Sequence, residues 1–276
     1  MRWVLLALCG CNQIFGVHGE LVRADAQQFD APTDAQPYCP AFGTLPAFSP
    51  LAHEVIDQEC FQYTFSSSGV ALANCRRPTT GQLDLVQGPI DSVLDEPATG
   101  LDRGDENHAV DGLHISPDGN AAYLESFDLG QTTTTIESYT RTGPTAWTRG
   151  PDITQSILAG ASSPSRGPEV HMLLFDRTAV DLHEVILTGG APIPVRTIAT
   201  TAPPLQVWLS PDGLRAFVLV DSLAPRYVYL ERPQLDADFT AHEPYTSLPA
   251  VAVFINEDCT RAYLSDVSAV FYVPQI

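Results

Sequence analysis

One stretch of the chain gathers side chains that could bind a cation. From Leu101 to Asp111 the sequence reads LDRGDENHAVD, and Asp105, Glu106, His108 and Asp111 supply carboxylate or imidazole groups. Carboxylate oxygens are the ligands that calcium prefers, and the same charges would attract an arginine-rich partner. Because the spacing fits no known calcium loop, we expect a solvated acidic loop, with a calcium site at these four residues as the alternative. The sequence therefore predicts no cofactor, calcium being the alternative.

The histidines elsewhere in the chain offer no shared metal site. Three His–Glu pairs, at positions 53–54, 183–184 and 242–243, join neighbouring residues, which point to opposite faces of a strand. His114 and His171 fall within predicted strands, where we expect them to pack in the core or between repeated units. No GxSxG, HExxH, GxGxxG or P-loop motif is present, so the sequence predicts a protein that is not an enzyme.

Four cysteines beyond the N-terminal segment predict two disulfides. They are Cys39, Cys60, Cys75 and Cys259, and four cysteines allow three pairings. Cys60 and Cys75 stand symmetrically about positions 67–68, so a two-stranded hairpin places them opposite each other. Such a bridge closes a loop of about 15 residues, worth roughly 3 kcal/mol in the chain-entropy model. Cys39 would then pair with Cys259.

The first residues resemble an export signal. One arginine precedes a short apolar run that cannot span a bilayer as a helix. The sequence LCGC, ending at Cys11, resembles the lipobox of bacterial lipoproteins, which implies removal of residues 1–10 and acylation of Cys11. Asn12 after that cysteine implies sorting to the outer membrane, facing the periplasm or the cell surface. Residues 11–38, rich in Asp, Ala, Gln and Pro, predict a flexible acidic tether.

A repeat organises the remainder of the chain. Segments 110–126, 206–222 and 252–268 each contain an apolar strand, a turn of the Ser-Pro-Asp-Gly type and a second apolar strand. The turn aspartates at 118, 212 and 258 are 94 and 46 residues apart, and 94 is twice 47. Degraded copies near 165 and 68 bring the turns to five. The turn residues are Asp118, Gly119, Asp212, Gly213 and Asp258.

The repeat has the character of a propeller blade. Asp-Gly suits a tight hairpin, because glycine accepts positive φ. The strand Ala216–Val220 is apolar at every position, as in a sheet covered on both faces. Four-stranded units stacked face to face around an axis meet that requirement. An arginine followed by an aromatic residue marks the third and fourth strands, as in Arg141 with Trp147 and Arg232 with Phe239.

We therefore predict an all-β fold, a β-propeller of four-stranded blades occupying residues 39–276. Five turns indicate five blades, with six as the alternative. Because the chain ends with the third strand of its last unit, a segment near Leu45 to Ile56 is expected to add the fourth strand and close the ring. The turns at 116–119 and 210–213 resemble those of TolB-type, WD-like propeller repeats, which implies a binding role without specifying a partner.

The charge balance excludes some partners. Fourteen basic residues, all arginine, oppose thirty-three acidic ones, giving a net charge of −19. This field repels nucleic acid and anionic lipid, so we expect membrane contact only through the lipid anchor. The sequence predicts a monomeric cell-envelope protein that binds or scaffolds a protein, peptide or glycan. The alternatives are an envelope enzyme, a lyase or glycan hydrolase with carboxylates at the channel mouth, and a purely structural envelope component.

Overall fold

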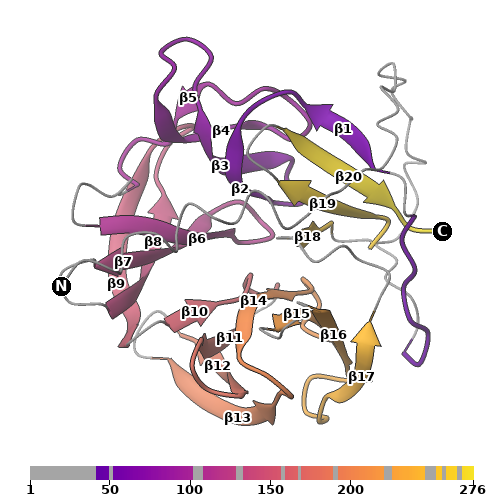
Figure 1. Ribbon diagram of the computed structural model, residues 1–276. Helices are drawn as coiled ribbons and strands as arrows, with labels where there is room; N and C mark the ends of the chain where they lie inside the picture. Colours follow the sequence, from indigo (N-terminus) through magenta and orange to yellow (C-terminus); the bar gives the residue numbers. More distant parts are fainter. Residues whose placement is uncertain are drawn as a thin grey trace, which may run out of the picture.

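The computed structural model is a five-bladed β-propeller (Figure 1). It describes residues 42–49, 52–101, 108–128, 133–156, 159–166, 169–188, 192–220, 226–245, 253–256, 259–265 and 269–276. None of these residues is helical, and this part of the chain accordingly contains no helix with the length and hydropathy of a membrane span. The predicted fold class and the count of five blades are confirmed, and six blades are excluded.

Each blade is a four-stranded antiparallel sheet, and its first strand lies nearest the axis. Blade 1 contains β2 (Cys60–Phe65), β3 (Val70–Arg76), β4 (Leu83–Pro89) and β5 (Glu96–Pro97). Blade 2 contains β6 (His108–Ile115), β7 (Ala121–Asp128), β8 (Thr133–Arg141) and β9 (Trp147–Ser156). Blade 3 contains β10 (Ala159–Ala161), β11 (Val170–Asp176), β12 (Asp181–Leu187) and β13 (Ile193–Ala199). Blade 4 contains β14 (Pro204–Leu209), β15 (Arg215–Val220), β16 (Arg226–Glu231) and β17 (Thr240–Tyr245).

Blade 5 joins the two ends of the chain. It contains β18 (Val253–Ile255), β19 (Arg261–Ser265), β20 (Val270–Pro274) and β1 (His53–Ile56). The N-terminal strand β1 is therefore the outermost strand, as predicted, and pairs with the C-terminal strand β20. Just before β1, Phe48 bridges to Gln275, and its buried ring packs in the core between blades 4 and 5. The last blade thus has its fourth strand.

The hydrophobic core consists of five layers, one in each interface between neighbouring blades. Strand β15 is covered on both faces, and all six of its residues are buried. This explains why the sequence Ala216–Val220 is apolar at every position. Phe217 packs toward blade 5 and Val218 toward blade 3. A blade exposes both faces when it stands alone, so each copy of the repeat depends on its two neighbours.

The turn between the first and second strands follows one design in all blades. One side chain accepts the backbone N–H of the first or second residue of the second strand, at 2.7–3.2 Å. These capping residues are Ser66, Ser116, Ser165, Ser210 and Asn256. Gly119 and Gly213 follow with φ of 75° and 69°, and Cys259 takes the same position with φ of 59°. Asp258, predicted as a turn residue, lies outside the described residues.

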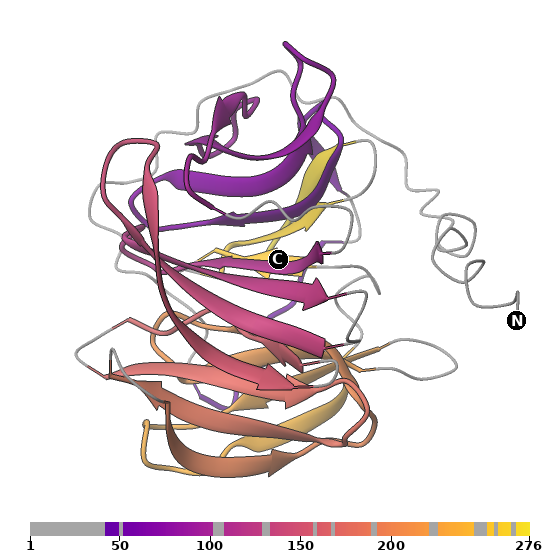
Figure 2. The same ribbon diagram turned by 90° about the vertical axis from the view of Figure 1, so that its left-hand side faces the viewer.

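The five turns define one end of the propeller, which we call the turn end. The connections between blades, and those between second and third strands, lie at the opposite end, which we call the loop end (Figure 2). Several loop-end segments lie outside the described residues, among them 102–107, 129–132, 221–225 and 246–252.

One predicted disulfide is present. Cys60 and Cys75 are bonded, lie directly opposite each other in the β2–β3 ladder, and are fully buried. Cys259 is also disulfide-bonded, and its partner cannot be either of these two. Cys39 and Cys11 lie outside the described residues, so the pairing of Cys39 with Cys259 and the acylation of Cys11 stay predictions.

Candidate functional site

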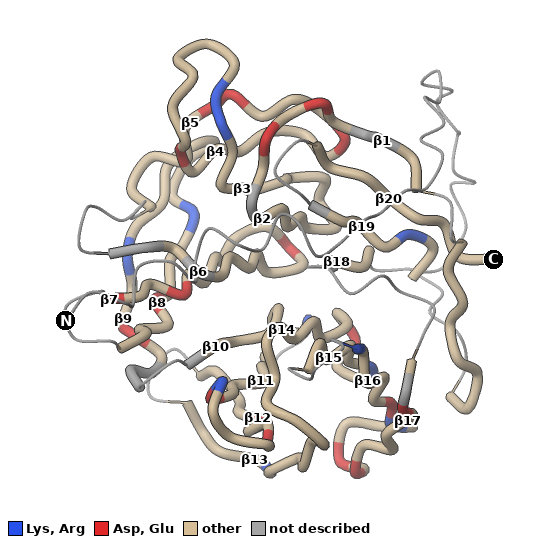
Figure 3. The backbone as a smooth tube through the Cα atoms, viewed as in Figure 1, with Lys and Arg blue, Asp and Glu red and all other residues tan. Residues whose placement is uncertain are grey.

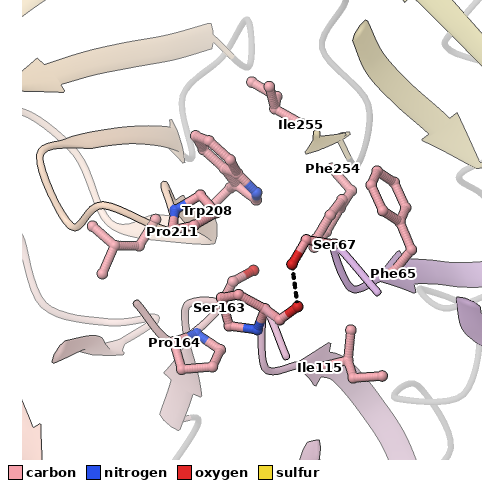
Figure 4. A pocket seen from close by; sticks show the side chains of 11 residues that line it. Phe65, Ser67, Ile115, Ser163, Pro164, Trp208, Pro211, Phe254 and Ile255 are labelled. Atoms are coloured by element: carbon pink, nitrogen blue, oxygen red, sulfur yellow. Dashed lines mark hydrogen bonds between the residues drawn. The ribbon is translucent and has the colours of Figure 1, made fainter. Parts of the chain in front are cut away.

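The axis is closed at the turn end by a ring of apolar residues. The residue before each capping residue lines a pocket there (Figure 4). The five are Phe65, Ile115, Pro164, Leu209 and Ile255. The pocket volume of about 20 Å³ suits a single water molecule. Ser163 lines it, and its hydroxyl is buried without a hydrogen-bond partner in the described structure. A pocket of this size cannot hold a sugar or a peptide.

Hydrogen bonds between turns brace this end. The Ser67 hydroxyl and the Ser67 N–H both donate to the Pro117 carbonyl of the next blade (Figure 4). In the same way the Arg166 N–H donates to the Pro211 carbonyl at 2.6 Å. The Arg166 guanidinium also donates to the Ser67 hydroxyl, joining blade 3 to blade 1. These hydrogen bonds link the turns of blades 1 to 4 at this end of the propeller.

A buried acid–base group lies between blades 2 and 3. Glu125, on β7, is 3% exposed, and its Oε1 accepts the Ala161 N–H at 2.9 Å. The same oxygen lies 3.3 Å from Nε2 of His114. Arg177 donates to Oε2 at 2.8 Å. Because His114 is on β6 and Ala161 on β10, the carboxylate lies between two of the innermost strands.

The local fold explains this arrangement. In the β6–β7 ladder Glu125 is opposite Gly112, and His114, two residues further along β6, lies on the same face. Arg177 belongs to the loop-end turn between β11 and β12, where Asp176 accepts the Thr178 N–H at 2.8 Å. The Arg177 side chain is 21% exposed, so the cluster approaches solvent on the loop side.

This arrangement supports proton transfer. A carboxylate beside an imidazole fixes its orientation and stabilises its protonated form. The guanidinium adds a positive charge close by. Tyr123 lies opposite His114 in the ladder, and burial, aided by the charge of Asp118, raises its pKa to about 12. Its hydroxyl is therefore protonated at neutral pH.

A second carboxylate of the same kind lies further from the axis. Glu184, on the third strand of blade 3, is fully buried. Its oxygens contact Nδ1 of His171 at 2.6 Å, the guanidinium of Arg232 at 2.8 and 3.0 Å, and Nε of Arg196 at 2.8 Å. Arg232 is itself fully buried, lies over the Phe239 ring at 4.3 Å, and donates to the Gly213 carbonyl. This cluster binds blade 4 to blade 3.

The acidic loop, for which a cation site was the alternative to a solvated loop, is only partly described. Asp105 and Glu106 lie outside the described residues. His108 and Asp111 are on β6, with Asp111 at a β-bulge between Val110 and Gly112, and their side chains are not described. Within the described ranges, no three His, Cys, Asp or Glu side chains come together as a metal site. Acidic residues are spread over several blades (Figure 3).

The positions expected for His114 and His171 are confirmed. His114 and His171 both lie at interfaces between blades, each beside a glutamate. His242 contacts Glu231 at 2.8 Å, whereas the neighbouring Glu243 pairs with Arg226. Adjacent His and Glu residues therefore serve separate partners, as expected for opposite faces of a strand.

Sequence reasoning missed Glu125, Gly112 and Arg177. A signal was available for the first two. Glu125 interrupts the apolar run of β7, five of whose eight residues are buried, and Gly112 interrupts an innermost strand. Arg177 gave no signal, because it meets Glu125 from 52 residues away across an interface between blades.

Comparisons with known proteins find likeness in structure and none in sequence. No protein-family model matches the chain, and no curated protein matches it in sequence. Among similar solved structures are a gluconolactonase from Xanthomonas campestris (9% identity, 88% of this chain and 98% of the other, TM-score 0.46) and a second protein titled a putative gluconolactonase (9% identity, 81% and 91%, TM-score 0.47). Another is a putative 6-phosphogluconolactonase from Bacteroides uniformis (14% identity, 72% and 61%, TM-score 0.45).

These findings correct one prediction. The expectation that the chain is not an enzyme is contradicted by these findings, since similar structures are named as lactonases, and the likeness itself shows only the fold of this chain. The reason lies in the motifs that were sought, since each is a local sequence pattern and a propeller builds its sites from residues far apart in sequence. Identities of 9–14% leave the substrate of this chain to be established from its own residues.

Proposed function

We propose that the protein is a hydrolase that acts on a small carbohydrate-derived substrate at the loop end of the propeller axis. One observation carries the proposal: the Glu125 carboxylate, buried between two innermost strands, contacts both His114 and Arg177. This deepens the enzyme alternative foreseen from the sequence, with one carboxylate and one imidazole in place of two carboxylates.

The chemistry follows from the three side chains. His114 takes a proton from water as the water oxygen attacks the acyl carbon of an ester or lactone. Glu125 stabilises the imidazolium, and Arg177 offers positive charge to the developing oxyanion. His114 then returns the proton to the leaving hydroxyl group, so that ester and water become acid and alcohol. In this scheme Glu125 is the partner of the imidazolium, and Arg177 is the partner of the oxyanion.

The route to this site is from the loop end. The apolar ring closes the turn end, and the pocket there holds about 20 Å³. Arg177, at the loop end, is the partly exposed member of the cluster. A substrate must therefore approach past Arg177, which favours small or terminal groups over the middle of a polymer.

The first test is a substrate panel assayed with the wild type, Glu125→Gln and Glu231→Gln. The panel contains five- and six-membered sugar lactones, chosen from the names of the similar structures, and short glycans. Glu231 is a matched control, because it is buried and paired with His242 but lies in blade 4. We expect one substrate class to be hydrolysed, with a loss of about 100-fold or more for Glu125→Gln alone.

Two results would contradict the proposal. One is the absence of hydrolysis across the panel by correctly folded wild-type protein. The other is equal activity of Glu125→Gln and the wild type on a substrate that is hydrolysed.

We also propose that the propeller is exported and lipid-anchored through Cys11 at the outer membrane. The buried Cys60–Cys75 disulfide supports an oxidising compartment. Metabolic labelling with a fatty acid should mark the full chain and fail to mark Cys11→Ser. Labelling that survives this substitution would refute the anchor.

A further inference from the structure

We infer that Gly112 is a positioning residue, whose missing side chain allows Glu125 to reach His114 and the Ala161 N–H. The expected effect on catalysis rests on the proposed function. The effect on the position of the Glu125 carboxylate rests on geometry alone. Gly112 has no side chain to offer a substrate. It acts through the carboxylate.

The Glu125 side chain occupies the space that a side chain at 112 would need. A Cβ atom built on Gly112 would lie 2.3 Å from Cδ, 2.5 Å from Oε1 and 2.7 Å from Cγ of Glu125. Carbon atoms pack at about 3.5–4.0 Å, so the carboxyl group would have to move by roughly 1 Å or more. Oε1, the oxygen shared by His114 and Ala161, is among the atoms displaced.

The β-bulge sets this register. The ladder shifts between Val110 and Gly112, leaving Asp111 as the extra residue and Gly112 directly opposite Glu125. Bulges redirect side chains and are common beside active sites. The glycine and the bulge together turn the Glu125 side chain across β6 and toward β10.

Other blades show the alternatives at the equivalent place. In blade 1 the innermost strand places Gln62 opposite Asn74, and in blade 4 it places Gln206 opposite Leu219. In blade 3 an innermost glycine, Gly160, again faces a large side chain. A Cβ on Gly160 would lie 2.2 Å from the ring of that residue, Phe175. Blades 2 and 3 thus both place an innermost glycine opposite a large side chain, and of these two only blade 2 has a carboxylate there.

The test compares Gly112→Ala with Gly150→Ala. Gly150 is a strand glycine in β9, and its Cβ would meet the Ser138 hydroxyl at 2.7 Å, far along the chain from Glu125. In Gly112→Ala we expect shifted NMR resonances of the His114 imidazole nitrogens and at least tenfold faster hydrogen exchange at the Ala161 amide. The kcat should fall about 100-fold with KM little changed, as expected for a displacement of roughly 1 Å. Gly150→Ala should leave all of these unchanged.

Stability provides a second, independent arm. If Gly112→Ala fails to fold, Gly112→Ala with Glu125→Ala removes the clash and should fold as well as Glu125→Ala alone. A double variant that stays unfolded overturns the inference, as does a folded Gly112→Ala with unchanged His114 resonances and unchanged Ala161 exchange. If the wild type hydrolyses nothing, the proposed function fails, and the NMR and stability arms still decide the role of Gly112.

Discussion

Two buried glutamates in this propeller have the same kinds of partner and different surroundings. Glu125 and Glu184 each contact one histidine and at least one arginine across an interface between blades. Glu184 lies on a third strand, and its partner Arg232 has no exposed side-chain surface. Glu125 reaches between two innermost strands, and its partner Arg177 is 21% exposed.

The comparison shows that similar residue types surround the proposed catalytic carboxylate and a carboxylate that joins two blades, an arrangement we call a clamp. Three cationic or imidazole side chains surround Glu184, and Arg232 in addition satisfies the Gly213 and Leu235 carbonyls. A cluster saturated in this way holds blades together and offers no place for a substrate. The cluster around Glu125 is smaller and closer to the axis, and its Arg177 side chain is partly exposed at the loop end. The proposed catalytic role of Glu125 depends on this difference in position.

The largest effect is expected from breaking the clamp. Arg232→Ala leaves Glu184 buried with less positive charge around it, and should lower the free energy of unfolding by about 3–5 kcal/mol. Urea denaturation measures the loss. Arg226→Ala, which breaks a partly exposed pair with Glu243, is the control and should cost less than about 1 kcal/mol. Similar losses for the two variants would show that the buried cluster is not a clamp.

The interface between blades 1 and 2 has an uncharged glutamine in place of the buried glutamate, and we expect it to contribute less stability. Gln87 on β4 is the third-strand counterpart of Glu184; its Oε1 accepts the Trp147 indole N–H at 2.9 Å, and its Nε2 donates to the Pro144 carbonyl at 2.7 Å. Gln87→Ala leaves the buried Trp147 indole N–H without this partner, whereas the exposed Pro144 carbonyl keeps the Arg141 guanidinium as a donor. The substitution should cost about 1–3 kcal/mol by urea denaturation. A loss larger than that of Arg232→Ala would reverse the ranking of the two interfaces.

The pH dependence near the Glu125 cluster gives a smaller effect. Burial raises the pKa of Tyr123 to about 12 from its usual value near 10. The folded state therefore holds this proton more tightly, so the stabilisation is complete below about pH 10 and lost as pH rises toward 12. Tyr123→Phe should flatten part of the decline in stability above pH 10. An identical alkaline decline in the variant would place the cause elsewhere.

Local patterns in the sequence predicted much of the fold. The Asp-Gly turns gave the repeat, the symmetric placement of Cys60 and Cys75 gave the disulfide, and the arginine–aromatic signature reappears as Arg232 over Phe239. Each of these depends on residues within one hairpin or one blade. The closing strand followed from the incomplete last unit, which is also a local observation.

The site could not be predicted in this way. Glu125 meets Arg177 and the Ala161 N–H across an interface between blades, and the separation in sequence is 52 and 36 residues. Such a pairing depends on how two blades pack, not on the pattern inside either one. The acidic residues between 105 and 111 form a visible pattern because they are close in sequence. The clusters around Glu125 and Glu184 are instead built from residues 11 to 52 positions away.

The catalytic role proposed for Glu125, His114 and Arg177, which we call the axial cluster, can be tested on the substrate identified by the panel. The test compares His114→Gln with His171→Gln. Both variants remove an imidazole that lies beside a buried glutamate. We predict that His114→Gln lowers kcat by about 100-fold or more, while His171→Gln, folded at the assay temperature, keeps kcat within about twofold of the wild type. Equal losses in the two variants, or full activity in His114→Gln, would contradict the assignment of the axial cluster as the catalytic site.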